Sequence, residues 1–160
     1  MKRLALGGLL GLVAGAVLAG LVILQVMPGM MIVTKPSRLG FDETVAAIQK
    51  GIADEGWSSP ATIDMNKSLA KHGVEFKPRV KIVQLCKAQY AKDVLTTDRY
   101  VASLMPCAVA VYETDDGGVY VSKMNTGLMG KLFGGTIAEV MGGKVADDEH
   151  AILKNVVAEE

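Results

Sequence analysis

Hydrophobic residues are unevenly distributed along this chain. Residues 4 to 33 contain no charged side chain, and the run from Leu4 to Met27 is almost wholly apolar. At ~1.5 Å per residue, a helix of that length reaches ~36 Å, enough to cross a hydrocarbon core of ~30 Å. The pattern therefore predicts an uncleaved N-terminal signal anchor, a transmembrane helix within residues 1–29 that ends at Pro28, followed by a second domain at 30–160.

A cleaved signal peptide is the alternative interpretation, because Ala14, Gly15 and Ala16 supply small residues at the spacing of a cleavage site. In the anchored form, a short N-terminal tail usually stays in the cytoplasm. We therefore expect a single-pass protein of the inner membrane, with its C-terminal domain in the periplasm.

Glycines in the apolar run are spaced four residues apart at Gly7, Gly11 and Gly15. On a helix they would form a smooth stripe that lets a second helix approach closely. Glycine and alanine are also simply common in signal anchors, so both interpretations stay open. The stripe is our candidate for helix packing in the membrane.

Beyond the apolar run, the hydrophobic pattern alternates between strand and helix periods. Val45, Ile48 and Ile52 recur at helical spacing, whereas residues 107–113 are apolar on both faces, as in a central strand. Residues 115–118, Asp-Asp-Gly-Gly, predict a tight hairpin turn. The expected elements are strands within 30–39, 61–65, 79–87, 107–113 and 119–123, and helices at 41–55, 66–72, 88–95, 126–141 and 147–156.

These elements indicate an α+β fold, with an antiparallel or mixed sheet of about five strands and helices packed on one face. Composition agrees with one ordinary domain after the anchor, because 50% of the 160 residues are hydrophobic and 21% are charged.

Basic and acidic residues number 17 each. This balance offers no basic surface for nucleic acid, so we expect no nucleic-acid partner.

The two cysteines, Cys86 and Cys107, each lie near the end of an apolar strand. Three interpretations stay open: a structural disulfide, two buried thiols that never meet, and a functional thiol or ligand pair. In an oxidising compartment, a bridge across this loop would stabilise the fold by ~3 kcal/mol.

Other residues are candidates for binding or redox chemistry because of their position. A carboxylate inside an apolar strand is paired, solvent-facing or functional, and the apolar segment after residue 126 could cover a pocket or contact a partner. The candidates beside the two cysteines are Asp64, Pro106, Met124, Asn125, Leu128, Met129 and Phe133.

Metal and cofactor chemistry has little support in the sequence. His72 and His150 have no metal-ligand spacing with each other or with a cysteine, so no metal site is predicted. Haem could be ligated by a histidine or by a methionine such as Met124 or Met129, but no Cys-x-x-Cys-His attachment sequence is present. The cofactor stays unknown.

The segments Val83–Ala91, Leu104–Glu113 and Asp116–Val119 resemble the family called domain of unknown function 302. The resemblance covers roughly residues 30 to 155. It implies a small α+β domain, often a dimer, found in many bacteria including sulfur-metabolising ones, with no agreed activity. The family's Cys-Asn-Pro-like segment reads Cys-Lys-Ala from Cys86 onward, whereas its Pro-Cys element is intact.

Together these observations predict a membrane-anchored periplasmic module that binds a small ligand or assists envelope redox or sulfur chemistry. We expect it to form a homodimer and to contact a membrane-bound redox or sulfur-metabolism complex. The alternatives are a thiol-disulfide carrier or enzyme that uses Cys86 and Cys107, and a haem-binding domain. Whether the chain is an enzyme is left open.

Overall fold

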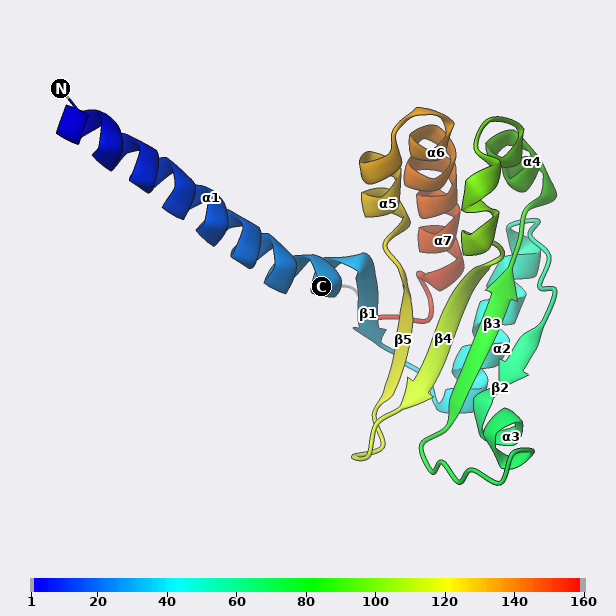
Figure 1. The fold of residues 1–160 in the computed structure, drawn as a ribbon. Coiled ribbons are helices and arrows are strands. Elements are labelled where there is room, and N and C mark those ends of the chain that lie inside the picture. Colours follow the sequence, from blue (N-terminus) through cyan, green and yellow to red (C-terminus); the bar gives the residue numbers. More distant parts are fainter. Residues whose placement is uncertain (1, 159–160) are drawn as a thin grey trace. The chain divides into compact units, whose positions relative to one another are not determined.

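The structure, a computed structural model, describes the backbone of residues 2–158 and the side chains of residue 12 and residues 15–158. It divides into two compact units, Met1–Met31 and Ile32–Glu160. The first unit is a single helix, α1 (Lys2–Met31), drawn in blue in Figure 1.

Helix α1 continues through Pro28 instead of ending there. A proline inside a helix removes one backbone hydrogen bond, and the residues on either side of Pro28 remain helical. Of the predicted glycine stripe, Gly7 and Gly11 lie outside the residues with described side chains. At Gly15, an added Cβ would meet no other atom within 4 Å.

The prediction of a membrane span is wrong: within the described part of the chain, no helix has both the length and the apolar character needed to cross a bilayer. This finding overturns the signal anchor and the transmembrane helix, and with them the inner-membrane and periplasmic location.

The predicted partners are corrected by the same finding. Membrane contact depended on the transmembrane helix, which is not present among the described helices. The homodimer, which the family resemblance implied, and the membrane-bound redox or sulfur-metabolism complex have no support in the described part of the structure.

The second unit has the predicted α+β class. Its five strands are β1 (Ile32–Pro36), β2 (Thr62–Asp64), β3 (Val80–Leu85), β4 (Cys107–Glu113) and β5 (Val119–Met124). They form one sheet in the order β1-β5-β4-β3-β2, and every neighbouring pair is antiparallel. The central position of β4 agrees with its sequence, since both of its faces are apolar.

Seven further helical segments accompany the sheet, together with a short π-helical stretch. The α-helices are α2 (Phe41–Asp54), α3 (Met65–Ala70), α4 (Ala88–Thr97), α5 (Thr126–Phe133), α6 (Gly135–Glu139) and α7 (Ala146–Leu153), with a 3₁₀ helix at Arg99–Leu104 and the π-helical segment at Val140–Val145. In Figure 1, α4, α5, α6 and the start of α7 gather at one end of the sheet, whereas α3 lies at the opposite end.

The core lies between α2 and one face of the sheet. Phe41, Val45, Ile48 and Ile52 are buried on α2 at the predicted helical spacing. They meet strand residues that are also buried, such as Val109. At ~1.5–3 kcal/mol for each large apolar side chain removed from water, this contact supplies much of the energy that holds the helix on the sheet.

The predicted helix at 126–141 is divided in two. Gly134 separates α5 from α6 with a φ of 73°, in the left-handed region that glycine adopts without strain. In the sequence, Gly134 and Gly135 already interrupt the apolar stripe, and the chain turns at these glycines. The predicted hairpin between β4 and β5 is confirmed, with Glu113 paired to Val119.

Candidate functional site

Antiparallel topology brings most of the predicted site residues to one end of the sheet. Strands β3 and β5 end at the edge where β4 begins, because each is antiparallel to β4. Cys86 follows β3, Cys107 begins β4, and Met124 ends β5. Figure 1 shows α5, which carries Met129, at this same end.

Asp64 lies apart from this group. It ends β2, which runs antiparallel to β3, and so it belongs to the opposite end of the sheet. Its side chain accepts a hydrogen bond of 3.0 Å from the backbone N–H of Lys67 and caps α3. A carboxylate at this position satisfies a free helix N–H, which gives Asp64 a structural role.

Asn125 also caps a helix. Its Oδ1 accepts a hydrogen bond of 3.0 Å from the backbone N–H of Leu128 at the start of α5. The cap fixes the direction in which the chain leaves β5. Asn125 therefore contributes to the site by orienting α5.

The two thiols are not bridged, and the predicted disulfide is wrong. Both cysteines are free. In the sheet, Cys107 is paired with Leu85 and not with Cys86. This register offsets the two cysteines by one residue, and no disulfide joins them.

The environment of Cys107 also disfavours thiol chemistry. Burial, followed by the nearby Glu149 and Cys86, raises the pKa of the Cys107 thiol to about 12. Only the thiolate is a good nucleophile, so this sulfur is protonated and unreactive near neutral pH.

A cavity of about 470 Å³, here called the thiol cavity, opens beside Cys107. Of the predicted residues, it is lined by Pro106, Cys107 and Met124. Two hollows of about 20 Å³ adjoin it, one lined by Cys86 and Cys107 and the other by Met124, Met129 and Phe133. The predicted residues therefore surround neighbouring spaces and do not converge on one.

A buried ion pair lies in the wall of the thiol cavity. Glu149 of α7 is only 2% exposed. Its Oε2 accepts hydrogen bonds from Lys123 Nζ at 2.7 Å and from Thr126 Oγ1 at 2.9 Å. Removing a carboxylate from water is costly unless it is paired in this way.

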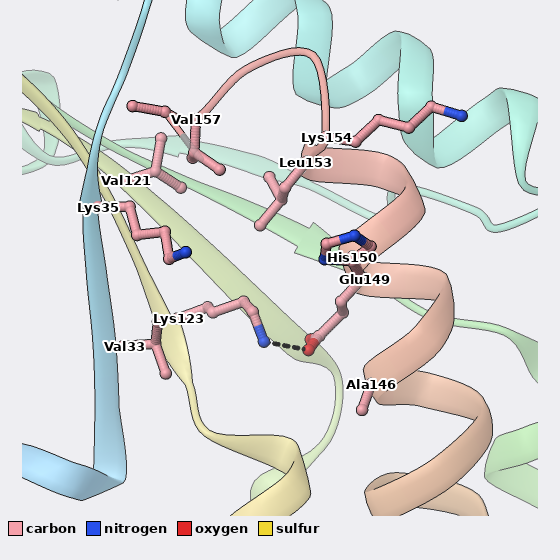
Figure 2. Close-up of a pocket in the computed structure, with 11 residues that line it drawn as sticks. Val33, Lys35, Val121, Lys123, Ala146, Glu149, His150, Leu153, Lys154 and Val157 are labelled. Carbon is pink, nitrogen blue, oxygen red and sulfur yellow. Dashed lines mark hydrogen bonds and ion pairs between the residues drawn. The ribbon is translucent and has the colours of Figure 1, made fainter. Parts of the chain in front are cut away.

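The same ion pair lines a second cavity, of about 230 Å³, which we call the lysine cavity. Figure 2 shows its walls: strands β1 and β5 on one side and α7 on the other, with the ion pair as a dashed line. The lining residues are Val33, Lys35, Val121, Lys123, Ala146, Glu149, His150, Leu153, Lys154, Val157 and Ala158.

Strand and helix periods explain how these side chains come together. Val33 is paired with Lys123, and Lys35 with Val121, so all four point to the same face of the sheet. On α7, the residues that line the cavity recur at intervals of three and four from Ala146 onward, which places them along one side of the helix. The small side chain of Ala146 leaves space between that side and the strands.

Sequence reasoning did not identify Lys35, Lys123 or Glu149. A signal was nevertheless present: Lys123 has the same strand parity as the buried Val121 and so belongs to the covered face. A lysine on the buried side of an alternating strand requires a partner. Which partner it finds cannot be read from the strand alone.

The part of the chain that the structure describes contains no group of three or more His, Cys, Asp or Glu residues placed to hold a metal ion. The thioethers of Met105, Met124 and Met141 line the thiol cavity beside Cys107. Sulfur ligands of this kind suit soft ions such as Cu(I) and not Mg²⁺ or Ca²⁺.

Comparison with known proteins identifies the fold. A family model described as "Domain of unknown function DUF302" matches residues 33–159. The crystal structure of an uncharacterized conserved protein of that family from Bacillus stearothermophilus is similar, with a TM-score of 0.69 and 19% sequence identity over 79% of this chain and 98% of that one. A search of curated proteins found no match.

Proposed function

The chain belongs to the DUF302 family, and from that premise we propose that its α+β unit is a small-ligand-binding module whose ligand occupies the lysine cavity. The family description states no activity. The proposal therefore depends on the geometry of this chain's own residues.

One observation carries the proposal: a cavity with apolar walls has a buried ion pair in its lining. Val33, Val121 and Leu153 supply apolar surface, while Lys123 and Glu149 supply polar groups. Ligand sites commonly combine these features, a mostly apolar lining with a few placed polar groups. A core built for stability alone would gain little from a buried ion pair, because well-packed apolar residues stabilise a fold equally well.

The size of the cavity limits the ligand. A volume of about 230 Å³ lies below the ~300–1,000 Å³ of common ligand pockets. The space therefore matches a ligand smaller than a nucleotide or a haem. The proposal is thus restricted to small metabolites.

The redox and haem alternatives receive less support. A thiol-disulfide carrier needs two thiols that can bridge, but Cys86 and Cys107 are both free and Leu85 is the strand partner of Cys107. Haem is too large for the lysine cavity. Among the described residues that line the thiol cavity and the hollow at Phe133, none is a histidine.

The test uses the full-length protein and four probes with the same six-carbon chain: hexanoate, hexanamide, 1-hexanol and hexylammonium. Binding is followed by NMR as shifts of the backbone amides of β1, β5 and α7. We expect at least one probe to bind there. The variant Ala146→Phe should abolish binding because the ring fills the cavity that Ala146 lines.

The control variant is Ala46→Phe, which adds the same ring at an exposed position of α2. It should bind the probes as the unmodified protein does. The proposal fails if no probe shifts the amides around the cavity, or if Ala146→Phe binds as well as Ala46→Phe.

A further inference from the structure

The charges around the lysine cavity are unbalanced. Among the residues that the structure describes, Lys35, Lys123 and Lys154 line it together with one acid, Glu149. Glu149 is already engaged by Lys123 at 2.7 Å. Of the described lysines in the lining, Lys35 and Lys154 are therefore left without this carboxylate as a partner.

Lys35 is the basic residue best placed to meet a ligand. Among the described residues, none forms an ion pair or side-chain hydrogen bond with it. Figure 2 shows its ammonium group turned from β1 toward the interior of the cavity, whereas the side chain of Lys154 extends away. Lys35 is also partly buried, so water solvates its charge less completely than it would at the surface.

Apolar surface surrounds this charge on the other sides. Val33 and Val121 project from the strands, and Leu153 and Val157 face them from the C-terminal segment. A small inorganic anion has no hydrocarbon chain and would leave this apolar surface exposed to water. A ligand with both a charged head and a hydrocarbon body would cover it while pairing with Lys35.

We propose that the ligand is a small organic carboxylate, with its head group bound by Lys35 beside the Lys123–Glu149 pair and its chain against the valines and Leu153. This inference rests on the proposed function and adds the chemical class of the ligand. A ligand with one negative charge matches Lys35, because this lysine points into the cavity and has no partner among the described residues.

The head group of the probe tests the proposal without altering the protein. In titrations of the full-length protein, hexanoate should bind about tenfold more tightly than hexanamide, which has the same length and shape but no charge. Hexylammonium should bind more weakly than either, because its charge has the same sign as that of Lys35. A tenfold ratio corresponds to about 1.4 kcal/mol.

A charge-removing variant then assigns the effect to one residue. Lys35→Met keeps most of the side-chain length and should reduce hexanoate binding about tenfold while leaving hexanamide binding unchanged. Lys81→Met is the matched control: Lys81 lies on the same face of the sheet, in β3, and its ammonium group pairs with Asp42. It changes the net charge equally and should leave both affinities as they are.

The outcomes separate this inference from the proposed function. Equal binding of hexanoate and hexanamide, a preference for hexylammonium, or full hexanoate affinity in Lys35→Met would overturn the carboxylate proposal alone. If none of the probes binds at the cavity, the proposed function itself fails. Because the head-group comparison uses the unmodified protein, it decides the matter even if Lys35→Met does not fold.

Discussion

The acidic run at the start of α7 shows how single residues acquire their roles. From the sequence, Asp147, Asp148 and Glu149 would favour the positive end of a helix dipole. In the structure, the residues before them are already helical, so no free helix end lies there. The three acids differ instead by partner: Glu149 binds Lys123, Asp148 binds Lys87, and Asp147 is exposed.

The buried ion pair gives a prediction at this scale. Glu149→Gln should lower the free energy of unfolding by about 3 kcal/mol, because it leaves the charge of Lys123 buried without a counter-charge. Adding Lys123→Met should recover more than half of that loss, since both charges are then gone and the new amide oxygen can still accept the hydrogen bond from Thr126. Denaturant unfolding of both single variants and the double variant measures this coupling. Additive losses would show that the pair does not interact.

At the scale of elements, close backbone contact replaces side-chain packing where α5 meets the π-helical segment. A Cβ added at Gly130 would lie 2.6 Å from the Cα of Gly142, closer than two atoms can approach without a shift. The two segments can touch here only because both residues lack a side chain. This contact holds α5 beside the thiol cavity.

Replacing the two glycines of α5 should therefore have opposite effects. Gly130→Ala should destabilise the fold by about 1–3 kcal/mol through overpacking. Gly127→Ala, in the same helix, meets nothing closer than 3.6 Å, and should be neutral or stabilising by up to ~1 kcal/mol through helix propensity. Thermal unfolding of the two variants measures the difference. Equal effects would mean that the backbone contact is not close in solution.

At the scale of the α+β unit, Asp148 connects three distant parts of the chain. Its Oδ2 accepts hydrogen bonds from Trp57 Nε1 at 2.9 Å and from Lys87 Nζ at 2.8 Å. Trp57 follows α2, Lys87 follows β3, and Asp148 lies on α7. The ammonium group of Lys87 also lies over the rings of Trp57 and Tyr90. This group fixes α7, and with it one wall of the lysine cavity.

This cluster predicts a dependence of stability on pH. Burial opposes ionisation of Asp148, but the hydrogen bonds from Lys87 and Trp57 outweigh it, and the pKa of Asp148 lies below its ordinary value of 3.8. The stabilisation is therefore present above pH 3.8 and is lost as the pH falls through the lowered pKa. Asp148→Asn should cost about 1–2 kcal/mol at pH 7 and progressively less in acid.

The control for this effect is Asp147→Asn, the same substitution at the neighbouring exposed acid. Its stability should follow that of the unmodified protein at every pH. Unfolding by denaturant between pH 7 and pH 3 measures all three proteins. A constant difference between Asp148→Asn and the unmodified protein across that range would contradict the assignment.

Local patterns alone determined much of the α+β unit. The helical repeat of Val45, Ile48 and Ile52, the apolar strand at 107–113 and the hairpin that follows it were all predicted, because each depends on neighbours in the sequence. The structure places the cysteines and the start of α5 near one end of the sheet.

Tertiary structure decided the rest, because burial and pairing depend on residues far apart in the chain. Strand register pairs Cys107 with Leu85 and not with Cys86, and the lysine cavity needs β1, β5 and α7 together. The membrane prediction relied on the apolar run alone, and the described part of α1 does not support it. The sequence shows which side chains are charged. Lys35 comes to line a cavity, and Lys123 comes to pair with Glu149, only because β1 and β5 pack against α7.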